Sequence, residues 1–170
     1  MSRGSLGSMR EIAASAGVTT GSAYSHFAAK AELMSALVTR ILDRHALVLI
    51  PEGGIRQLTA ATLRDLTHNE SDAARLLVLV WGLLIEDRDG VAEQIRERLE
   101  RNRSHLTDVV RRALEIDGVA PDEAAARARA AADALIGFLQ MLAVQIATMT
   151  NVDTGRMVRF ASDAMELWAK

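Results

Sequence analysis

The sequence predicts an all-α protein in which an amino-terminal helix-turn-helix precedes a larger helical bundle. Alanine, leucine, arginine and glutamate dominate its 170 residues, and only two prolines, Pro51 and Pro121, interrupt them. This mixture favours helix over sheet. Apolar residues recur at helical spacing along every long segment, and no segment alternates convincingly with the period of two expected of a strand. With 49% hydrophobic and 25% charged residues, the chain can bury a sizeable core and does not resemble a disordered one.

Two short helices joined by a tight turn are predicted near the amino terminus. Ser8 and Glu11 are spaced as a capping box, in which each side chain accepts a hydrogen bond from the other's backbone amide. The helix that they open should run to about residue 15 or 16, where Gly17 can end it in a left-handed conformation. Thr19 is the N-cap candidate of a second helix over about residues 20–27.

A third helix begins near Lys30, and a cluster of helix breakers over residues 51–54 marks a domain boundary. The third helix carries, at helical spacing, Leu33, Leu37, Ile41 and Leu42. The segment Pro51-Glu52-Gly53-Gly54 separates a helix-turn-helix domain over 1–48 from a second helical domain over 49–170. The helices of the second domain are expected at roughly 55–68, 72–87, 91–116, 121–150 and 154–169, with N-caps at Asp72, Asp122 and Asp153.

The first two helices carry the side chains that a DNA-binding helix-turn-helix requires. Small residues, Ala13 and Ala23, would let the two helices cross closely around a small core formed by Ile12, Val18 and Phe27. The second helix displays hydroxyl and imidazole groups, which reach phosphate oxygens and base edges. These groups, with a glycine that allows close backbone approach, belong to Thr19, Thr20, Gly21, Ser22, Tyr24, Ser25 and His26.

The distribution of charge is compatible with a DNA-contacting end. Residues 1–50 hold five basic and three acidic residues and so carry a net charge of +2, whereas the whole chain carries −2. Lys30 stands at the start of the third helix, where its charge and the free backbone amides both favour a phosphate. The alternative interpretation is an ordinary solvated helix face, but the concentration of hydroxyl groups on this one helix favours DNA.

Residues 8–33 resemble the DNA-binding signature of TetR-family repressors. The matching positions are Ile12-Ala13, Ala16-Gly17-Val18, Thr19, Gly21, Tyr24, His26-Phe27, Lys30 and Glu32-Leu33. The resemblance implies phosphate contacts from Tyr24, His26 and Lys30, and from Ser8 and Thr19 at their helix N-termini. It implies base contacts from Thr20, Gly21, Ser22 and Ser25. The resemblance further implies a dimeric regulator, most simply a repressor, that holds a pseudo-palindromic operator and is released by a small apolar ligand.

Two departures from the family pattern leave a second interpretation open. The family has a further helix before this motif, whereas only residues 1–7 precede it here, so most of that first helix is expected to be missing. Ala28-Ala29 also stands where the family usually has a capping residue before the lysine. The alternative is therefore a dimeric helical bundle that binds a ligand or a protein and has no role on DNA.

Other classes of function find little support in the sequence. The chain has no cysteine, which excludes disulfides and thiolate metal sites and fits a cytoplasmic protein. Its histidines form no paired metal motif, and no nucleotide-binding or nucleophile motif is present, so we expect no metal, no cofactor and no enzyme; a small helical enzyme is the weaker alternative. The longest apolar run, residues 76–85, is half the length that spans a bilayer, and no signal peptide or membrane partner is expected.

The last two predicted helices have more apolar surface than one domain core needs. In the 121–150 helix, leucines and an isoleucine form one apolar face, while Phe138, Met141 and Met149 form another. A second copy of the chain is the simplest cover for the second face, although a central helix of a monomeric bundle would look similar. TetR-like proteins pair through these helices. The dimer candidates are Gly137, Ala147, Met157, Phe160, Ala161, Ala164 and Trp168.

The same resemblance places a small-molecule site among the middle helices. Aromatic and methionine side chains fill irregular pockets, and one or two polar groups orient a guest. The candidates are Trp81, Leu84, His105, Val109, Phe138, Met141, Leu142 and Gln145. Each could equally be ordinary core, but as a set they indicate an apolar or weakly polar ligand.

Overall fold

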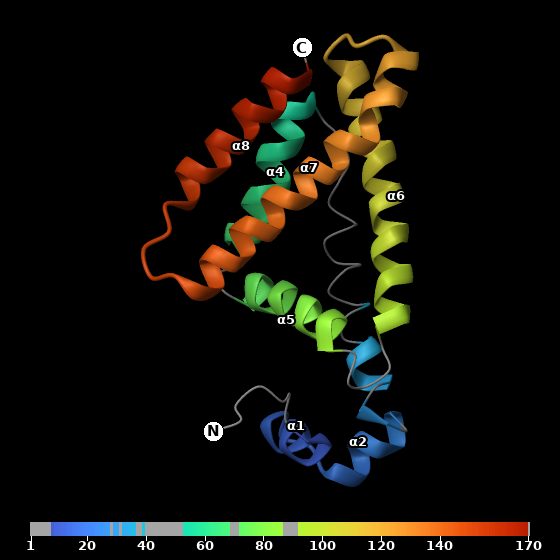
Figure 1. Cartoon of the computed structure of the whole chain (residues 1–170). Helices are drawn as coiled ribbons and strands as arrows, with labels where there is room; N and C mark the ends of the chain where they lie inside the picture. Colours follow the sequence, from blue (N-terminus) through green and yellow to red (C-terminus); the bar gives the residue numbers. More distant parts are fainter. Residues whose placement is uncertain are drawn as a thin grey trace.

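The computed structural model describes residues 8–27, 29, 30, 32–36, 39, 53–68, 72–86 and 92–169, which are predominantly helical and include no strand. Two short helices, α1 (Met9–Ser15) and α2 (Thr20–His26), lie at one end of the molecule (Figure 1). Residues 30, 32–36 and 39 are also helical. Three positions predicted for the third helix, Leu37, Ile41 and Leu42, lie outside the described residues. The predicted all-α class with a helix-turn-helix in front is confirmed.

Five longer helices form the body of the molecule. They are α4 (Ile55–His68), α5 (Asp72–Glu86), α6 (Ala92–Ile116), α7 (Pro121–Thr148) and α8 (Thr154–Ala169). Helix α7 crosses the body obliquely and packs against α6 and α5, while α4 packs chiefly against α8 (Figure 1). Each begins and ends within about two residues of its predicted range, because the apolar periodicity and the turn residues both mark the ends.

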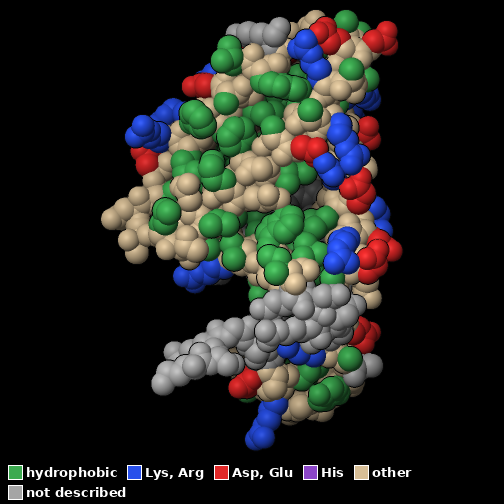
Figure 2. All heavy atoms as spheres, viewed as in Figure 1, with side chains coloured by type: hydrophobic (Ala, Val, Ile, Leu, Met, Phe, Trp, Pro, Cys, Tyr) green, Lys and Arg blue, Asp and Glu red, His purple; other side chains and the backbone are tan. Residues whose placement is uncertain are grey.

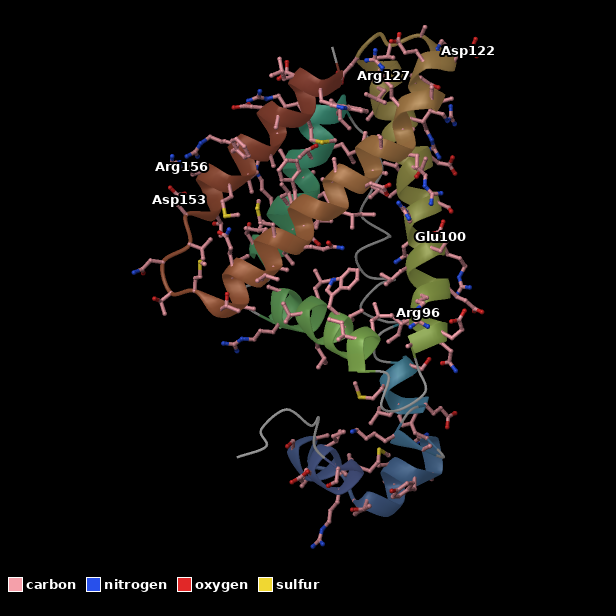
Figure 3. The ribbon with its side chains drawn as sticks, viewed as in Figure 1. Arg96, Glu100, Asp122, Arg127, Asp153 and Arg156 are labelled. Carbon is pink, nitrogen blue, oxygen red and sulfur yellow. The ribbon has the colours of Figure 1, made fainter. Side chains whose placement is uncertain are left out.

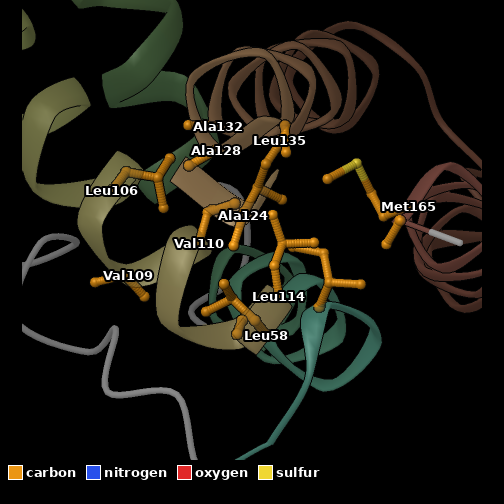
Figure 4. Close-up of a cluster of buried hydrophobic side chains, with 14 residues drawn as sticks. Leu58, Leu106, Val109, Val110, Leu114, Ala124, Ala128, Ala132, Leu135 and Met165 are labelled. Atoms are coloured by element: carbon orange, nitrogen blue, oxygen red, sulfur yellow. The ribbon is translucent and has the colours of Figure 1, made fainter. Parts of the chain in front are cut away.

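The core of the body consists of two adjoining clusters of buried side chains. The larger joins α4, α6, α7 and α8, and Leu114 and Leu135 are completely buried in it (Figure 4). Small side chains of α7 let α6 and α7 approach closely. Four of these side chains are at most 1% exposed: Ala124, Ala128, Ala131 and Ala132. The smaller cluster joins α4, α5, α7 and α8 and includes Leu63, Leu66 and Leu142.

The helix caps of the body agree only in part with the sequence. Asp153 accepts a hydrogen bond from the backbone amide of Arg156 at 2.8 Å, as expected of an N-cap. The prediction of Asp122 as the N-cap of α7 is wrong. Ala120 occupies that position without a side-chain hydrogen bond, because Pro121 takes the first helical turn and leaves Asp122 inside it. Asp72 is itself the first residue of α5.

Asp117 supplies a cap to a helix that is distant in the sequence. Its carboxylate Oδ2 accepts a hydrogen bond of 2.7 Å from the amide of Ile55, the first residue of α4. Gly54 makes room for this carboxylate, since a Cβ at residue 54 would lie 1.7 Å from Asp117 Oδ1. Gly118, in the turn between α6 and α7, has a φ of +88°. The Asp117 hydrogen bond connects this turn to the first residue of α4.

We expect Gly54→Ala to lower the free energy of unfolding by about 1–3 kcal/mol, because the new methyl group displaces the Asp117 carboxylate and leaves the Ile55 amide unsatisfied. Chemical denaturation of Gly54→Ala, Asp117→Ala and the double variant measures this effect. The two substitutions should be strongly non-additive, because either one breaks the same hydrogen bond. Additive losses would show that the carboxylate does not cap α4.

Helix α7 meets the length and composition criteria of a membrane span, with a mean hydropathy of 1.6 over its most apolar window. The central helices of folded domains meet the same criteria. In this fold α7 packs against α4, α5, α6 and α8, and its alanine-rich half lies in the larger core cluster. Packing within the body covers only part of this apolar surface, since 28% of that window is buried.

Candidate functional site

The start of the helix-turn-helix has the predicted caps. The Ser8 amide donates to Glu11 Oε2 at 2.6 Å, and the Glu11 amide donates to Ser8 Oγ at 3.3 Å, so the capping box is complete. The hydrogen bond from the Ser8 amide lowers the pKa of Glu11. Gly17 has a φ of +70°, and the amide of Val18 returns to the carbonyl of Ala13 at 3.0 Å. This left-handed residue ends α1 and turns the chain into α2.

The second helix is fixed at its start by Thr19. Its Oγ1 accepts a 3.0 Å hydrogen bond from the amide of Ser22. Within α2 the Ser25 hydroxyl donates to the Ser22 carbonyl at 2.7 Å. The helix ends at Phe27, whose backbone is extended with a φ of −134°. The predicted bounds of both short helices are confirmed to within about one residue.

The small core between these helices differs from the predicted one. Ala13 is buried as expected, whereas Val18 is 47% exposed, so its prediction as a core residue is wrong. Val18 follows the left-handed Gly17 in the turn, outside both helices. Met9 and Met34, each at most 5% exposed, are buried instead. Methionine is flexible enough to fill an irregular gap between short helices. Ile12, Ala23 and Phe27 are half-buried.

Helix α2 presents almost its whole surface to solvent. It contains no buried residue, and Tyr24 is 52% exposed. Thr20 and Lys30 are half-buried. The remaining side chains expected to contact DNA are exposed: Ser8, Thr19, Gly21, Ser22, Ser25 and His26. The structure therefore places the predicted DNA-contacting residues on α2, its N-cap and the capped start of α1, and Lys30 on the helical residues that follow α2.

A hydrogen bond between two described side chains joins the helix-turn-helix region to the body. The Ser35 hydroxyl donates to Gln94 Oε1 at 2.5 Å. Ser35 belongs to the helical residues that follow α2, and Gln94 lies in the first turn of α6. The amino-terminal end of α6 thus contacts the helical residues that follow α2.

An open cavity of about 660 Å³ lies between α5, α6 and α7. Trp81, Leu84 and Ile85 form its α5 wall, and the opposite walls come from α6 and α7. Figure 3 marks Arg96 and Glu100 along α6. The residues of α6 and α7 that line the cavity are Arg96, Leu99, Glu100, Arg103, Asp133, Ile136, Gly137 and Gln140. Its volume is within the range typical of small-molecule sites.

A forked ion pair between α6 and α7 forms the polar wall of this cavity. Arg103 Nε donates to Asp133 Oδ1 at 2.6 Å, and its terminal Nη2 donates to Asp133 Oδ2. Glu100 Oε2 lies 3.7 Å from Arg103 Nη1. The hydrogen bonds from Arg103 lower the pKa of Asp133, and the same contact raises the pKa of Arg103. Both side chains are about one third exposed.

The eight ligand candidates taken from the sequence do not line one cavity. Trp81 and Leu84 line the α5–α6–α7 cavity. Val109 and Leu142 are buried in the two separate core clusters, and Phe138 packs against both. His105 and Met141 are exposed, and Gln145 is half-buried. Sequence reasoning missed Arg103 and Asp133, because nothing local to either residue signals a pair formed across 30 positions.

The dimer candidates also occupy different environments. On α8, Phe160 and Trp168 are 64% and 44% exposed, whereas Ala161 is buried in the smaller cluster. Ala147, Met157 and Ala164 are half-buried, and Gly137 lines the α5–α6–α7 cavity. Two further exposed apolar residues were not predicted, Val144 on α7 and Leu167 on α8, while Met149, which the sequence placed on the second apolar face, is 61% exposed just beyond the end of α7. Figure 2 shows hydrophobic side chains scattered over the face where α7 and α8 lie.

Comparison with known proteins identifies the amino-terminal part of the chain. Residues 5–37 match the family model of bacterial regulatory proteins, tetR family. The match covers α1, the turn at Gly17, α2 and the helical residues that follow. No curated protein and no solved structure matches the chain. The expectation that most of the family's first helix is missing concerns residues 1–7, which lie outside the described residues. The amino-terminal helix-turn-helix, with its capped and solvent-facing second helix, is therefore similar to that of the bacterial regulatory proteins of the tetR family.

Proposed function

We propose that this regulator is a cytoplasmic repressor that binds a pseudo-palindromic operator as a homodimer and leaves it when a small molecule binds the body. Residues 1–48 form the DNA-binding domain, and residues 49–170 form the ligand-binding and dimerisation domain. The observation that carries the proposal is the exposure of α2, which buries no side chain of its own. A helix with this polar surface is available to enter a major groove.

The placement of the polar side chains suggests a division of roles on DNA. Tyr24, His26 and Lys30, together with the caps Ser8 and Thr19, would hold phosphates, because hydroxyls, cations and helix N-termini suit phosphate oxygens. Thr20, Gly21, Ser22 and Ser25 would face base edges. Each protomer would place one such helix in successive major grooves, so the operator repeats with the spacing of the two helices.

The outward apolar face of α7 and α8 supports the homodimer. Phe160 and Leu167 are more than 60% exposed, and Trp168 and Val144 are nearly half exposed. Aromatic side chains contribute large apolar areas to interfaces. Pairing two such faces about a twofold axis would cover them and would fix the distance between the two copies of α2.

The contact between Ser35 and Gln94 supports coupling between ligand and DNA. Helix α6 carries Gln94 in its first turn and, further along, four of the residues that line the cavity. A ligand that moves this part of α6 would therefore move the helix-turn-helix. A coupling free energy of about 1–3 kcal/mol is usual for such switches.

The first test is Lys30→Ala in the purified regulator. If Lys30 holds a phosphate, binding to operator and to unrelated duplexes should weaken alike, by about tenfold. The slope of log affinity against log salt should then become shallower by about 0.9 for each phosphate that the protein no longer neutralises. Fluorescence anisotropy with labelled duplexes from low to moderate salt measures both quantities.

Arg112→Ala is the matched control, because it removes the same charge from an exposed position on α6 in the body. It should change neither the affinity nor the slope. An unchanged slope in Lys30→Ala would contradict the phosphate role of Lys30. If the unaltered chain has no salt-sensitive affinity for any duplex, the proposal of operator binding fails.

A further inference from the structure

We propose that the cavity between α5, α6 and α7 binds an uncharged, largely apolar molecule that carries a hydrogen-bonding group, and that the Arg103–Asp133 pair excludes charged ligands. The inference rests on the proposed function only in taking this molecule as the effector. The preference for neutral over charged ligands depends only on the side chains that line the cavity, whether or not the ligand acts as an effector.

The apolar part of the cavity suits a flat or branched hydrocarbon body. Trp81 and Leu84 on α5 are half-buried, as are Leu99 on α6 and Ile136 on α7. Gly137 adds space, because a Cβ at this position would meet no atom within 4 Å. Ile85 on the same wall is 81% exposed, so a ligand there would cover apolar surface that is now in water.

Every ionic group that lines the cavity already has a protein partner. Arg103 holds Asp133 through two hydrogen bonds. Glu100 accepts from Arg129 at 3.1 Å, and Arg96 donates to Glu93 at 3.0 Å. The lining itself carries two positive and two negative side chains. An anion that binds either arginine would lie beside the carboxylate that this arginine already holds, and a cation that binds either carboxylate would lie beside its arginine, so charged ligands gain little.

Gln140 is the polar group that a neutral ligand would use. It is half-buried and lines the cavity, and its amide forms no hydrogen bond with the residues that the structure describes. A carboxamide both donates and accepts, so it can meet a carbonyl, hydroxyl or amine without any ion pair being broken. The cavity therefore offers hydrogen bonding from Gln140 and apolar contact from α5.

The experiment uses two fluorescent probes with the same aromatic skeleton, neutral N-phenyl-1-naphthylamine and its anionic 8-sulfonate, 8-anilinonaphthalene-1-sulfonate. Both are titrated into the full chain, and only binding that is abolished by Gly137→Phe, which fills the cavity, is assigned to it. The neutral probe should bind the unaltered protein at least about tenfold more tightly than the sulfonate. Asp133→Asn should raise the affinity of the sulfonate about tenfold and leave that of the neutral probe within about threefold, because Arg103 is then free to pair with an anion.

Two further variants separate selection by charge from general disruption. Asp163→Asn removes a carboxylate from an exposed ion pair with Arg56, between α4 and α8, and should leave both affinities unchanged. The double variant Arg103→Gln with Asp133→Asn should bind the sulfonate no more tightly than the unaltered protein does. Circular dichroism verifies that each variant is folded.

The inference is overturned if neither probe shows binding that depends on the cavity. It is equally overturned if the sulfonate binds the unaltered cavity as tightly as the neutral probe, or if Asp133→Asn leaves their ratio unchanged in a folded protein. None of these measurements involves DNA. Failure here therefore leaves operator binding standing, and failure of operator binding leaves the selectivity of the cavity testable.

Discussion

Replacing Phe160 and Trp168 together with glutamate should convert the proposed dimer into monomers and lower operator affinity by about 100-fold or more. Both side chains are on the outward face of α8 and are 64% and 44% exposed in the single chain. Four carboxylates, two from each protomer, would have to lose their hydration in an apolar interface, which costs far more than such an interface gains. A monomer also loses the gain in affinity that comes from linking two half-site contacts.

Sedimentation velocity measures the oligomeric state, and anisotropy with an operator duplex measures the affinity. Ile116→Glu is the matched control, because Ile116 is an equally apolar and 55% exposed residue at the end of α6. It should leave the dimer intact. If the double variant stays dimeric at micromolar concentration, the subunits pair through another surface.

Leu135→Ala should lower the free energy of unfolding by about 3–4 kcal/mol. Leu135 is completely buried near the middle of α7, in the cluster that also receives side chains from α4, α6 and α8. Truncation removes apolar contacts and leaves a cavity that helices on all sides are too tightly packed to fill. Such a loss is a large fraction of the stability of an ordinary domain.

Urea denaturation followed by circular dichroism measures the loss at fixed protein concentration. Ile116→Ala removes the same number of carbon atoms from a half-exposed site, where the expected loss is below about 1 kcal/mol. A loss of similar size at both positions would mean that Leu135 is not at a closely packed centre.

Local features of the fold could be predicted from the sequence, because each depends on residues a few positions apart. The Ser8–Glu11 box and the Thr19 cap join residues three apart, and Gly17 determines the turn by its own backbone preference. The Asp117 cap joins residues 62 positions apart, and the Arg103–Asp133 pair joins residues 30 apart. Such contacts follow from how the helices cross, which one sequence does not specify.

The candidate sites show the same difference between local features, which the sequence predicts, and features that depend on how the helices pack. Most residues expected to contact DNA could be located in the fold because they lie on one short helix and its N-cap, whereas Ser8 caps α1 and Lys30 follows α2. The ligand candidates came from helices whose rotations were unknown, so Val109 fell in the core and Met141 on the surface. On α8 the period of 3.6 identified the apolar positions but could not tell Ala161, which faces the body, from Phe160, which faces outward.

The alanine-rich half of α7 limits how the proposed ligand cavity could be altered without unfolding the body. Ala124, Ala128, Ala131 and Ala132 are at most 1% exposed in the larger core cluster, where longer side chains would overpack the contact between α6 and α7. A library that randomises this half of the helix would therefore yield mostly unfolded chains. New specificities should instead be recovered from the α5 wall at Trp81, Leu84 and Ile85, where a longer or shorter side chain alters the shape of the cavity and leaves the joint between α6 and α7 intact.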